Sequence, residues 1–320
     1  MAEFDDELSQ QADRISVPTG PFDATMVASA PRRPSLLPVF VVPSLALLAA
    51  LVLQAVIVVA WISMHSDANS INTGESAKKM QSEPWMFLVL AFPTELAVLV
   101  AAVVAGRAAP EGPRLSLGLA RASLAGWNYP VFIVASTIPL TVGLLMAQAT
   151  ACVLPPDNSL SDLYQRMTPV FVAVFVPFIA LAPGLCEEVL FRGYVQRRLL
   201  QRWSPWAAIA MSSLLFSLMH LDPSHVALAL PLGVWLGVLA WRTGSIWPGV
   251  LCHASVNGLW NAFQIPVVQG DIGESVQYTV IGIAWGLGLI CFVIALAILY
   301  RRRQAIPLQA YPVFQTGIVG

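Results

Sequence analysis

Residues 168–187 read TPVFVAVFVPFIALAPGLCE. This stretch is almost wholly apolar and carries no charged side chain before its last residue, Glu187. An α-helix needs about 20 mostly apolar residues to cross the hydrocarbon core of a bilayer. The stretch therefore predicts a transmembrane helix, and we expect it to continue past the acidic pair Glu187–Glu188 as a more polar helix toward Arg202.

The rest of the chain has the composition of a membrane protein. Of its 320 residues, 57% are hydrophobic and 11% are charged, and the mean hydropathy is +0.71. Ordinary soluble domains contain about 45–50% apolar and about 25% charged residues, so the composition excludes a soluble enzyme and a disordered chain. The net charge of −1 gives no bulk attraction to nucleic acid. The expected partner is the membrane.

Seven further apolar stretches predict helices of comparable length. They lie at 36–63, 85–106, 127–154, 205–221, 224–242, 246–264 and 278–300. We therefore expect an all-α, polytopic membrane protein with about eight transmembrane helices. Residues 1–35 are polar and are expected to form a disordered cytoplasmic tail, and residues 301–320 are expected to form a second cytoplasmic tail.

Basic residues are distributed unequally between the two sides of this predicted bundle. With an even number of spans, both termini lie on one side, and all but three of the 17 Lys and Arg residues fall there. The three exceptions are Lys78, Lys79 and Arg166. Because cytoplasmic loops carry an excess of such residues, both termini are predicted to be cytoplasmic.

Charged residues within the predicted spans are functional candidates, because a charge at membrane depth costs at least about 2.5–3.5 kcal/mol. Glu188 and Arg192 are i,i+4 neighbours with the acid before the base, an order that favours an ion pair. Adjacent helical residues point about 100° apart, so Glu187 is left to face another helix and is a candidate general base. The alternative is a charge cluster that holds the helix end at the interface. Glu95 is either a cavity-lining residue or a structural hydrogen-bonding residue.

Polar residues at helical spacing also mark two later spans. His253 and Asn257 project from one face of the predicted helix 246–264, and Phe216 and His220 have the same spacing in 205–221. Each histidine alone is explained by hydrogen bonding between helices. Two histidines together with Glu187 instead indicate that the three residues form one functional site.

The spacing along the chain permits these groups to meet. Glu187 and His220 each lie about sixteen residues from the bend at 203–205, so a helical hairpin places them at one level. His253 is expected near that level. One conflict remains: His220 lies just before Pro223, so its helix ends there. Either that loop dips into the membrane or the expected depth is wrong.

These residues resemble the motifs of the CPBP family (CAAX protease and bacteriocin-processing), also called the ABI family of intramembrane metalloproteases, whose founding relatives are type II CAAX-prenyl endopeptidases. The family pattern is EExxxR, FxxxH and HxxxN or HxxxD on successive helices. All three motifs are present, as Glu187-Glu188…Arg192, Phe216…His220 and His253…Asn257. The resemblance implies a protease core at 165–265, preceded by three helices within 36–164 and followed by one within 266–300.

The resemblance further implies an intramembrane endopeptidase that hydrolyses a peptide bond near the cytoplasmic membrane face. Glu187 would activate the attacking water with the help of His220, while His253 and Asn257 would stabilise the oxyanion or hold a metal. Supporting roles would fall to Glu188, Arg192 and Phe216.

The resemblance leaves several alternatives open. Glu187, His220 and His253 form a catalytic zinc set that leaves one position for water, whereas a metal-free glutamate–histidine mechanism uses the same residues. The implied partner is a protein or peptide substrate, and the family's example of a lipidated one is a prenylated CAAX tail. In a prokaryote the protein would be a multi-pass protein of the plasma membrane. The competing interpretation is a non-catalytic binding, maturation or bacteriocin-immunity protein that retains the pocket.

Overall fold

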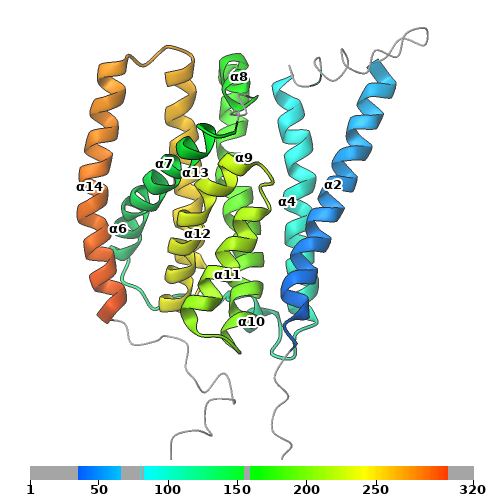
Figure 1. The fold of residues 1–320 in the computed structure, drawn as a ribbon, viewed down its shortest axis with the longest axis vertical. Helices are drawn as coiled ribbons and strands as arrows, with labels where there is room; N and C mark the ends of the chain where they lie inside the picture. The colour runs from blue at the N-terminus through cyan, green and yellow to red at the C-terminus, as the bar shows by residue number, and fades with distance from the viewer. Residues whose placement is uncertain (1–34, 66–79, 81–82, 155–158, 302–320) are drawn as a thin grey trace, which may run out of the picture. The chain divides into compact units, whose positions relative to one another are not determined.

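The fold was analysed in a computed structural model that describes residues 35–65, 80, 83–154 and 159–301. The predicted tails at 1–35 and 301–320 lie almost wholly outside this part of the chain. The predicted all-α class is confirmed, because every regular element of the described residues is helical (Figure 1).

Helices lie at every position where the sequence predicts a span. The first four positions hold α2 (Leu37–His65), α4 (Pro84–Arg107), the pair α6 (Asn128–Ala135) and α7 (Thr137–Ala151), and α9 (Pro169–Glu188). The next four hold α11 (Pro205–Leu218), α12 (Pro223–Thr243), α13 (Trp247–Val268) and α14 (Glu274–Arg301). Two short helices, α5 (Pro113–Ser116) and α8 (Ser159–Arg166), lie in connecting segments.

Helix α9 continues beyond the acidic pair, as the sequence predicts. A π-helical turn, η2 (Val189–Val195), and a short helix, α10 (Gln196–Leu200), extend the helical run to residue 200. All seven residues of η2 are buried. Single π-helical turns are rare and often occur at functional sites, and this one begins directly after Glu188.

Six helical runs in the described part of the chain are long and apolar enough to cross a membrane. Two of the eight predicted spans are not among them. Helix α11 has 14 residues and is therefore about 21 Å long, shorter than the hydrocarbon core of about 30 Å. Helix α13 has 22 residues, but His253, Asn257 and Asn261 lower its hydropathy. A complete count of eight spans stays a prediction.

The helices differ in how much of their surface the protein itself covers. In the most apolar window of α12, 50% of residues are buried, compared with 11% in α2, α4 and α14. The uncovered side chains of these outer helices are large and apolar, for example Val56 on α2 and Ile283 on α14. Such surfaces are stable only against lipid, so the outer helices face the bilayer and α12 lies inside the bundle.

Helices α9 and α13 pack against each other in antiparallel directions. The Asn257 amide donates to the Ile179 carbonyl at 3.2 Å, and one turn further along α9 the backbone of Gly184 lies against Ala254. A Cβ atom on Gly184 would come within 3.0 Å of the Ala254 side chain. Small residues thus let the two helices approach closely, and this register brings the acidic end of α9 to the middle of α13.

Candidate active site

Glu188 is a fully buried carboxylate with two charged or polar partners. Its Oε1 atom accepts hydrogen bonds from Arg192 Nη1 at 2.6 Å and from His253 Nδ1 at 3.1 Å. The side chains of Glu188 and Arg192 are both 0% exposed. The ion pair predicted from the i,i+4 spacing is therefore present, and Glu188 also fixes the orientation of the His253 ring.

Arg192 is held on three sides. Besides Glu188, its guanidinium donates from Nη2 to the Gly233 carbonyl of α12 at 3.1 Å. The guanidinium carbon lies 4.2 Å from the centre of the Phe216 ring, a cation–π distance. Glu188 and Arg192 thus connect η2 to α11, α12 and α13.

Gly249 provides the space in which the Glu188 carboxylate lies. It precedes His253 by one turn of α13, so both residues present the same face to α9. A Cβ atom on Gly249 would come within 2.8 Å of Glu188 Oε2, a distance that real Cβ contacts do not show. The sequence analysis did not single out Gly249, because its role depends on the register between two helices.

Glu187 and His253 face each other across the same helix pair. Glu187 Oε2 lies 3.7 Å from His253 Nε2. This distance is longer than a direct hydrogen bond, and polar groups so separated often share a water molecule. The Glu187 side chain is 17% exposed, whereas that of Glu188 is 0% exposed. Of the two adjacent acids, only Glu187 is therefore partly exposed.

His220 lies in the turn between α11 and α12. Its Nδ1–H donates to the Phe216 carbonyl at 3.3 Å, and its ring centre lies 5.4 Å from the Phe216 ring centre. The His253 ring contacts the same phenyl ring at 5.8 Å. The predicted FxxxH spacing thus brings both histidines to one aromatic side chain.

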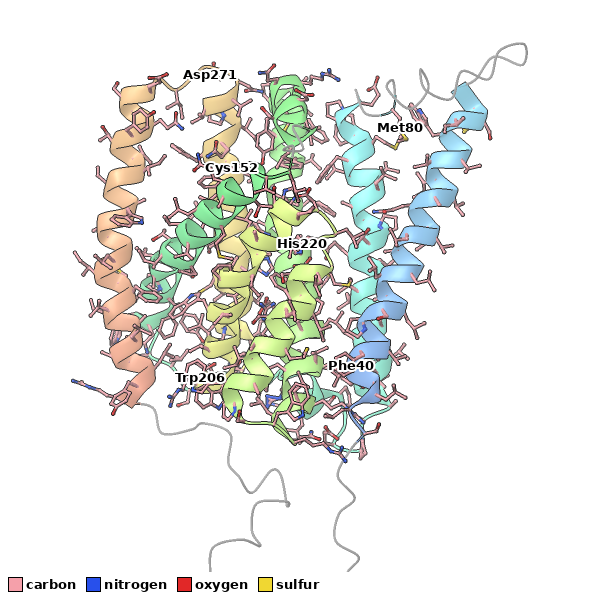
Figure 2. All side chains as sticks on the ribbon, in the orientation of Figure 1. Phe40, Met80, Cys152, Trp206, His220 and Asp271 are labelled. Carbon is pink, nitrogen blue, oxygen red and sulfur yellow. The ribbon has the colours of Figure 1, made fainter. Side chains whose placement is uncertain are left out.

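The sequence predicts that the helix carrying His220 ends just after this residue, and the structure shows how deep the resulting turn lies. Asp222 caps α12 by accepting from the His225 backbone N–H at 2.8 Å, so the chain reverses directly after His220. Leu221 takes a left-handed backbone conformation with φ of 61°, which is uncommon for a bulky residue. Figure 2 shows His220 at mid-height, between the levels of Trp206 and Cys152. The turn therefore lies at mid-depth of the bundle, with His220 and Leu221 exposed at its surface.

Asn257 is supported by two residues behind it on α13 and α8. Its backbone carbonyl accepts from the Asn261 side-chain amide at 2.8 Å, and Asn261 Oδ1 accepts a short hydrogen bond from the Tyr164 hydroxyl. Tyr164 is buried, and this burial raises its pKa, so the hydroxyl stays a donor. Sequence reasoning missed Tyr164, because its partner lies 97 positions away.

Glu95 reaches the site from α4. The nearby residues Val98 and Ala102 share its helical face and pack in one cluster with Cys186 at the end of α9. The carboxylates of Glu95 and Glu187 are near enough to interact electrostatically, and Glu95 Oε2 is buried without a hydrogen-bond partner among the described residues. These contacts favour the cavity-lining interpretation of Glu95.

Comparison with known proteins identifies the segment that holds all three motifs. Residues 169–259 match the family model for Type II CAAX prenyl endopeptidase Rce1-like proteins. This segment is similar to Rce1-like proteins. The match runs from the start of α9 into α13, and it confirms the resemblance to CAAX proteases that the motifs predict. No curated protein and no solved structure gives a significant match.

The donor set of this segment can be compared with what a metal ion requires. Within the described residues, no group of three or more His, Cys, Asp and Glu side chains is arranged to hold a metal. His253 uses Nδ1 to bind Glu188, and His220 uses Nδ1 to bind the Phe216 carbonyl. The zinc set Glu187, His220 and His253 stays a prediction, because both bonds leave Nε2 of each ring free, as in most metal-ligating histidines.

Proposed function

We propose that this protein is an intramembrane endopeptidase that hydrolyses a peptide bond of a protein or peptide substrate near the cytoplasmic membrane face. The observation that supports it best is the pair Glu187–His253, in which a partly accessible carboxylate oxygen and an imidazole nitrogen face each other at 3.7 Å. The match to Type II CAAX prenyl endopeptidase Rce1-like proteins supports the same reaction class.

In the proposed reaction Glu187 acts as the general base. Its carboxylate takes a proton from a water molecule, and the water oxygen attacks the carbonyl carbon of the scissile peptide bond. The C–N bond then breaks, and the proton is returned from Glu187 to the leaving amine. His220 assists this proton transfer from the turn after α11.

Asn257, and His253 when its ring also carries a proton on Nε2, stabilise the oxyanion of the tetrahedral intermediate. Both lie on the face of α13 that packs on α9, and an Asn amide has two N–H donors, of which Asn257 uses one on Ile179. Donors fixed before the reaction stabilise developing charge without reorganisation. Glu188, Arg192 and Phe216 hold these groups in place from the buried side.

The proposal is tested by comparing membrane proteomes of cells that carry the wild-type protein, Glu187→Gln or His220→Ala. Uncut precursor proteins should accumulate with either variant, because loss of a general base typically reduces the rate by about 10²–10⁴-fold. Glu83→Gln is a matched control, since Glu83 is an exposed glutamate at the start of α4 and its loss should leave processing unchanged.

Two outcomes would contradict the proposal. If Glu187→Gln supports processing as well as the wild type does, the protein is a non-catalytic binding or immunity protein that keeps the pocket. If deletion of the whole protein leaves the precursor and mature forms of every membrane protein unchanged, no proteolytic role remains.

A further inference from the structure

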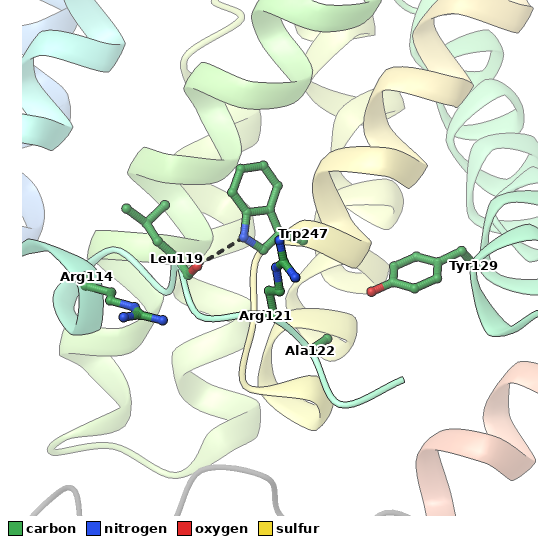
Figure 3. Close-up of a pocket in the computed structure, with 6 residues that line it drawn as sticks. All are labelled: Arg114, Leu119, Arg121, Ala122, Tyr129 and Trp247. Carbon is green, nitrogen blue, oxygen red and sulfur yellow. Dashed lines mark hydrogen bonds between the residues drawn. The ribbon is translucent and has the colours of Figure 1, made fainter. Parts of the chain in front are cut away.

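A cavity lies at the end of the bundle where α4 ends and α13 begins. It measures about 580 Å³ and is lined by Arg114, Leu119, Arg121, Ala122, Tyr129 and Trp247 (Figure 3). Cavities of roughly 300–1,000 Å³ are typical of ligand sites. None of these residues belongs to the proposed active site.

The cavity walls are fixed by hydrogen bonds between distant parts of the chain. Trp247 Nε1 donates to the Leu119 carbonyl at 3.1 Å, and the Ile246 N–H donates to the Gly118 carbonyl at 3.1 Å. Arg197 donates to the Gly244 carbonyl at 3.3 Å. The loop after α5, which carries Arg121, is thus attached to the turn before α13, and Arg114 lies on α5 just before this loop.

These two arginines have no acidic partner among the described residues. Arg114 and Arg121 are exposed, and neither makes an ion pair with any described Asp or Glu side chain. The nearest acid along the chain, Glu111, instead accepts from Gln201 at 3.2 Å. The Tyr129 hydroxyl is a further donor to the same space (Figure 3). The cavity therefore offers charge and hydrogen-bond donors to an anion.

The surroundings place this cavity at the level of lipid headgroups. Exposed tryptophans mark the membrane–water interface, and Trp127, Trp206 and Trp247 are 59%, 61% and 37% exposed. Among the described residues, this end of the bundle carries eight arginines and one acid. The arginines are Arg107, Arg114, Arg121, Arg197, Arg198, Arg202, Arg242 and Arg301, and the acid is Glu111.

We propose that this cavity binds the phosphate of an anionic glycerophospholipid. Arginine forks match phosphate oxygens, the tryptophan and leucine side chains suit the apolar part next to the headgroup, and basic pockets between membrane helices bind such headgroups. The same chemistry would accept free phosphate or a peptide carboxylate. The interfacial position and the open, aromatic wall favour the lipid.

The test uses the purified full-length protein and native mass spectrometry with added phosphatidylglycerol or phosphatidylcholine. Phosphatidylglycerol should bind saturably and more tightly than phosphatidylcholine. Each arginine near the surface contributes about fivefold in affinity, so Arg114→Gln with Arg121→Gln should weaken binding about 25-fold. The single variant Arg121→Gln should weaken it about fivefold, and it provides the test if the double variant is unstable.

The matched control is Arg107→Gln with Arg301→Gln, which removes the same charge from exposed arginines outside the cavity. It should change phosphatidylglycerol binding by less than about twofold. Equal weakening by the two double variants would overturn the proposal, because general surface charge would then explain the binding. The measurement needs no peptide cleavage, so its result does not depend on the proposed protease activity.

Two competitors distinguish the other sources of the same chemistry. Millimolar inorganic phosphate should not displace phosphatidylglycerol. A short peptide with a free C-terminal carboxylate should displace it no more than the same peptide with a C-terminal amide does. Displacement by phosphate would assign the cavity to a soluble anion, and selective displacement by the carboxylate peptide would assign it to substrate. Either result would overturn the lipid proposal.

Discussion

At the scale of single residues, the two adjacent glutamates have separate roles. Glu188 is fully buried with Arg192, and loss of one partner of a buried ion pair typically costs about 3–5 kcal/mol. Glu188→Gln should therefore lower the free energy of unfolding by about this amount, while Glu187→Gln should change it by less than about 1 kcal/mol. Chemical unfolding of the purified variants in detergent measures both, and equal losses would contradict the assignment.

Gly249 gives a second residue-scale prediction. An added methyl group would come within 2.8 Å of Glu188 Oε2, so Gly249→Ala should move that carboxylate and with it the His253 ring. A misplacement of about 1 Å in a catalytic group costs about 10²-fold in rate, and substrate processing should fall by about that factor.

Gly286→Ala is the matched control for this prediction, because a Cβ atom there meets no atom within 4 Å. Processing by Gly286→Ala should equal that of the wild type. If Gly249→Ala retains full activity, the contact between Glu188 and His253 does not matter for the reaction.

At the scale of helices, the sequence predicts which faces carry the site but not how those faces meet. The i,i+4 rule predicts the Glu188–Arg192 pair and the shared face of His253 and Asn257. The bond from Glu188 to His253 depends on the antiparallel register of α9 and α13, which is set by small residues such as Gly184. Periodicity within one helix carries no information on that register.

Helix length also explains which spans were difficult to predict. Helix α11 ends at Leu218, because the chain reverses direction directly after His220. Hydropathy shows only that a stretch is apolar, not whether it crosses the whole bilayer. The π-helical turn η2 was also not predictable, since its composition does not differ from that of an α-helix.

Helix α8 is tied to α13 by the Tyr164 hydroxyl, and this bond can be tested by substitution. Tyr164→Phe leaves the Asn261 Oδ1 atom without its donor, which should cost about 1–3 kcal/mol of stability. Tyr278→Phe is the control, because Tyr278 is 68% exposed on α14. An equal effect of the two substitutions on chemical unfolding would contradict a role for the bond.

Tyr164 also predicts a dependence of stability on pH. Burial raises the pKa of its hydroxyl above the ordinary value of 10.0, so the folded state holds this proton more tightly than the unfolded state. The resulting stabilisation is fully present below pH 10 and is lost as the pH rises from there toward the raised pKa. Wild-type stability should therefore fall more steeply above pH 10 than that of Tyr164→Phe.

At the scale of the whole molecule, charge decides the orientation of the bundle in the membrane. One end carries eight of the described arginines, while the other carries Arg166 with the acids Glu83, Asp162, Asp271 and Glu274. By the positive-inside rule the arginine-rich end is predicted to be cytoplasmic. The proposed lipid site then lies in the cytoplasmic leaflet, where anionic headgroups attract basic residues.

Cysteine labelling tests this orientation with a residue that the chain already provides. Cys152 is exposed just after α7, between the levels of His220 and Asp271 (Figure 2), whereas Cys186 and Cys252 are buried. A membrane-impermeant maleimide should label Cys152 in intact cells, and Cys152→Ser should remove that signal. In the Cys152→Ser background, Arg114→Cys should react only after the membrane is permeabilised. The opposite pattern would place the arginine-rich end outside the cell. The proposed active site could then not reach an uncleaved cytoplasmic tail of a substrate, and peptide hydrolysis near the cytoplasmic face would be contradicted.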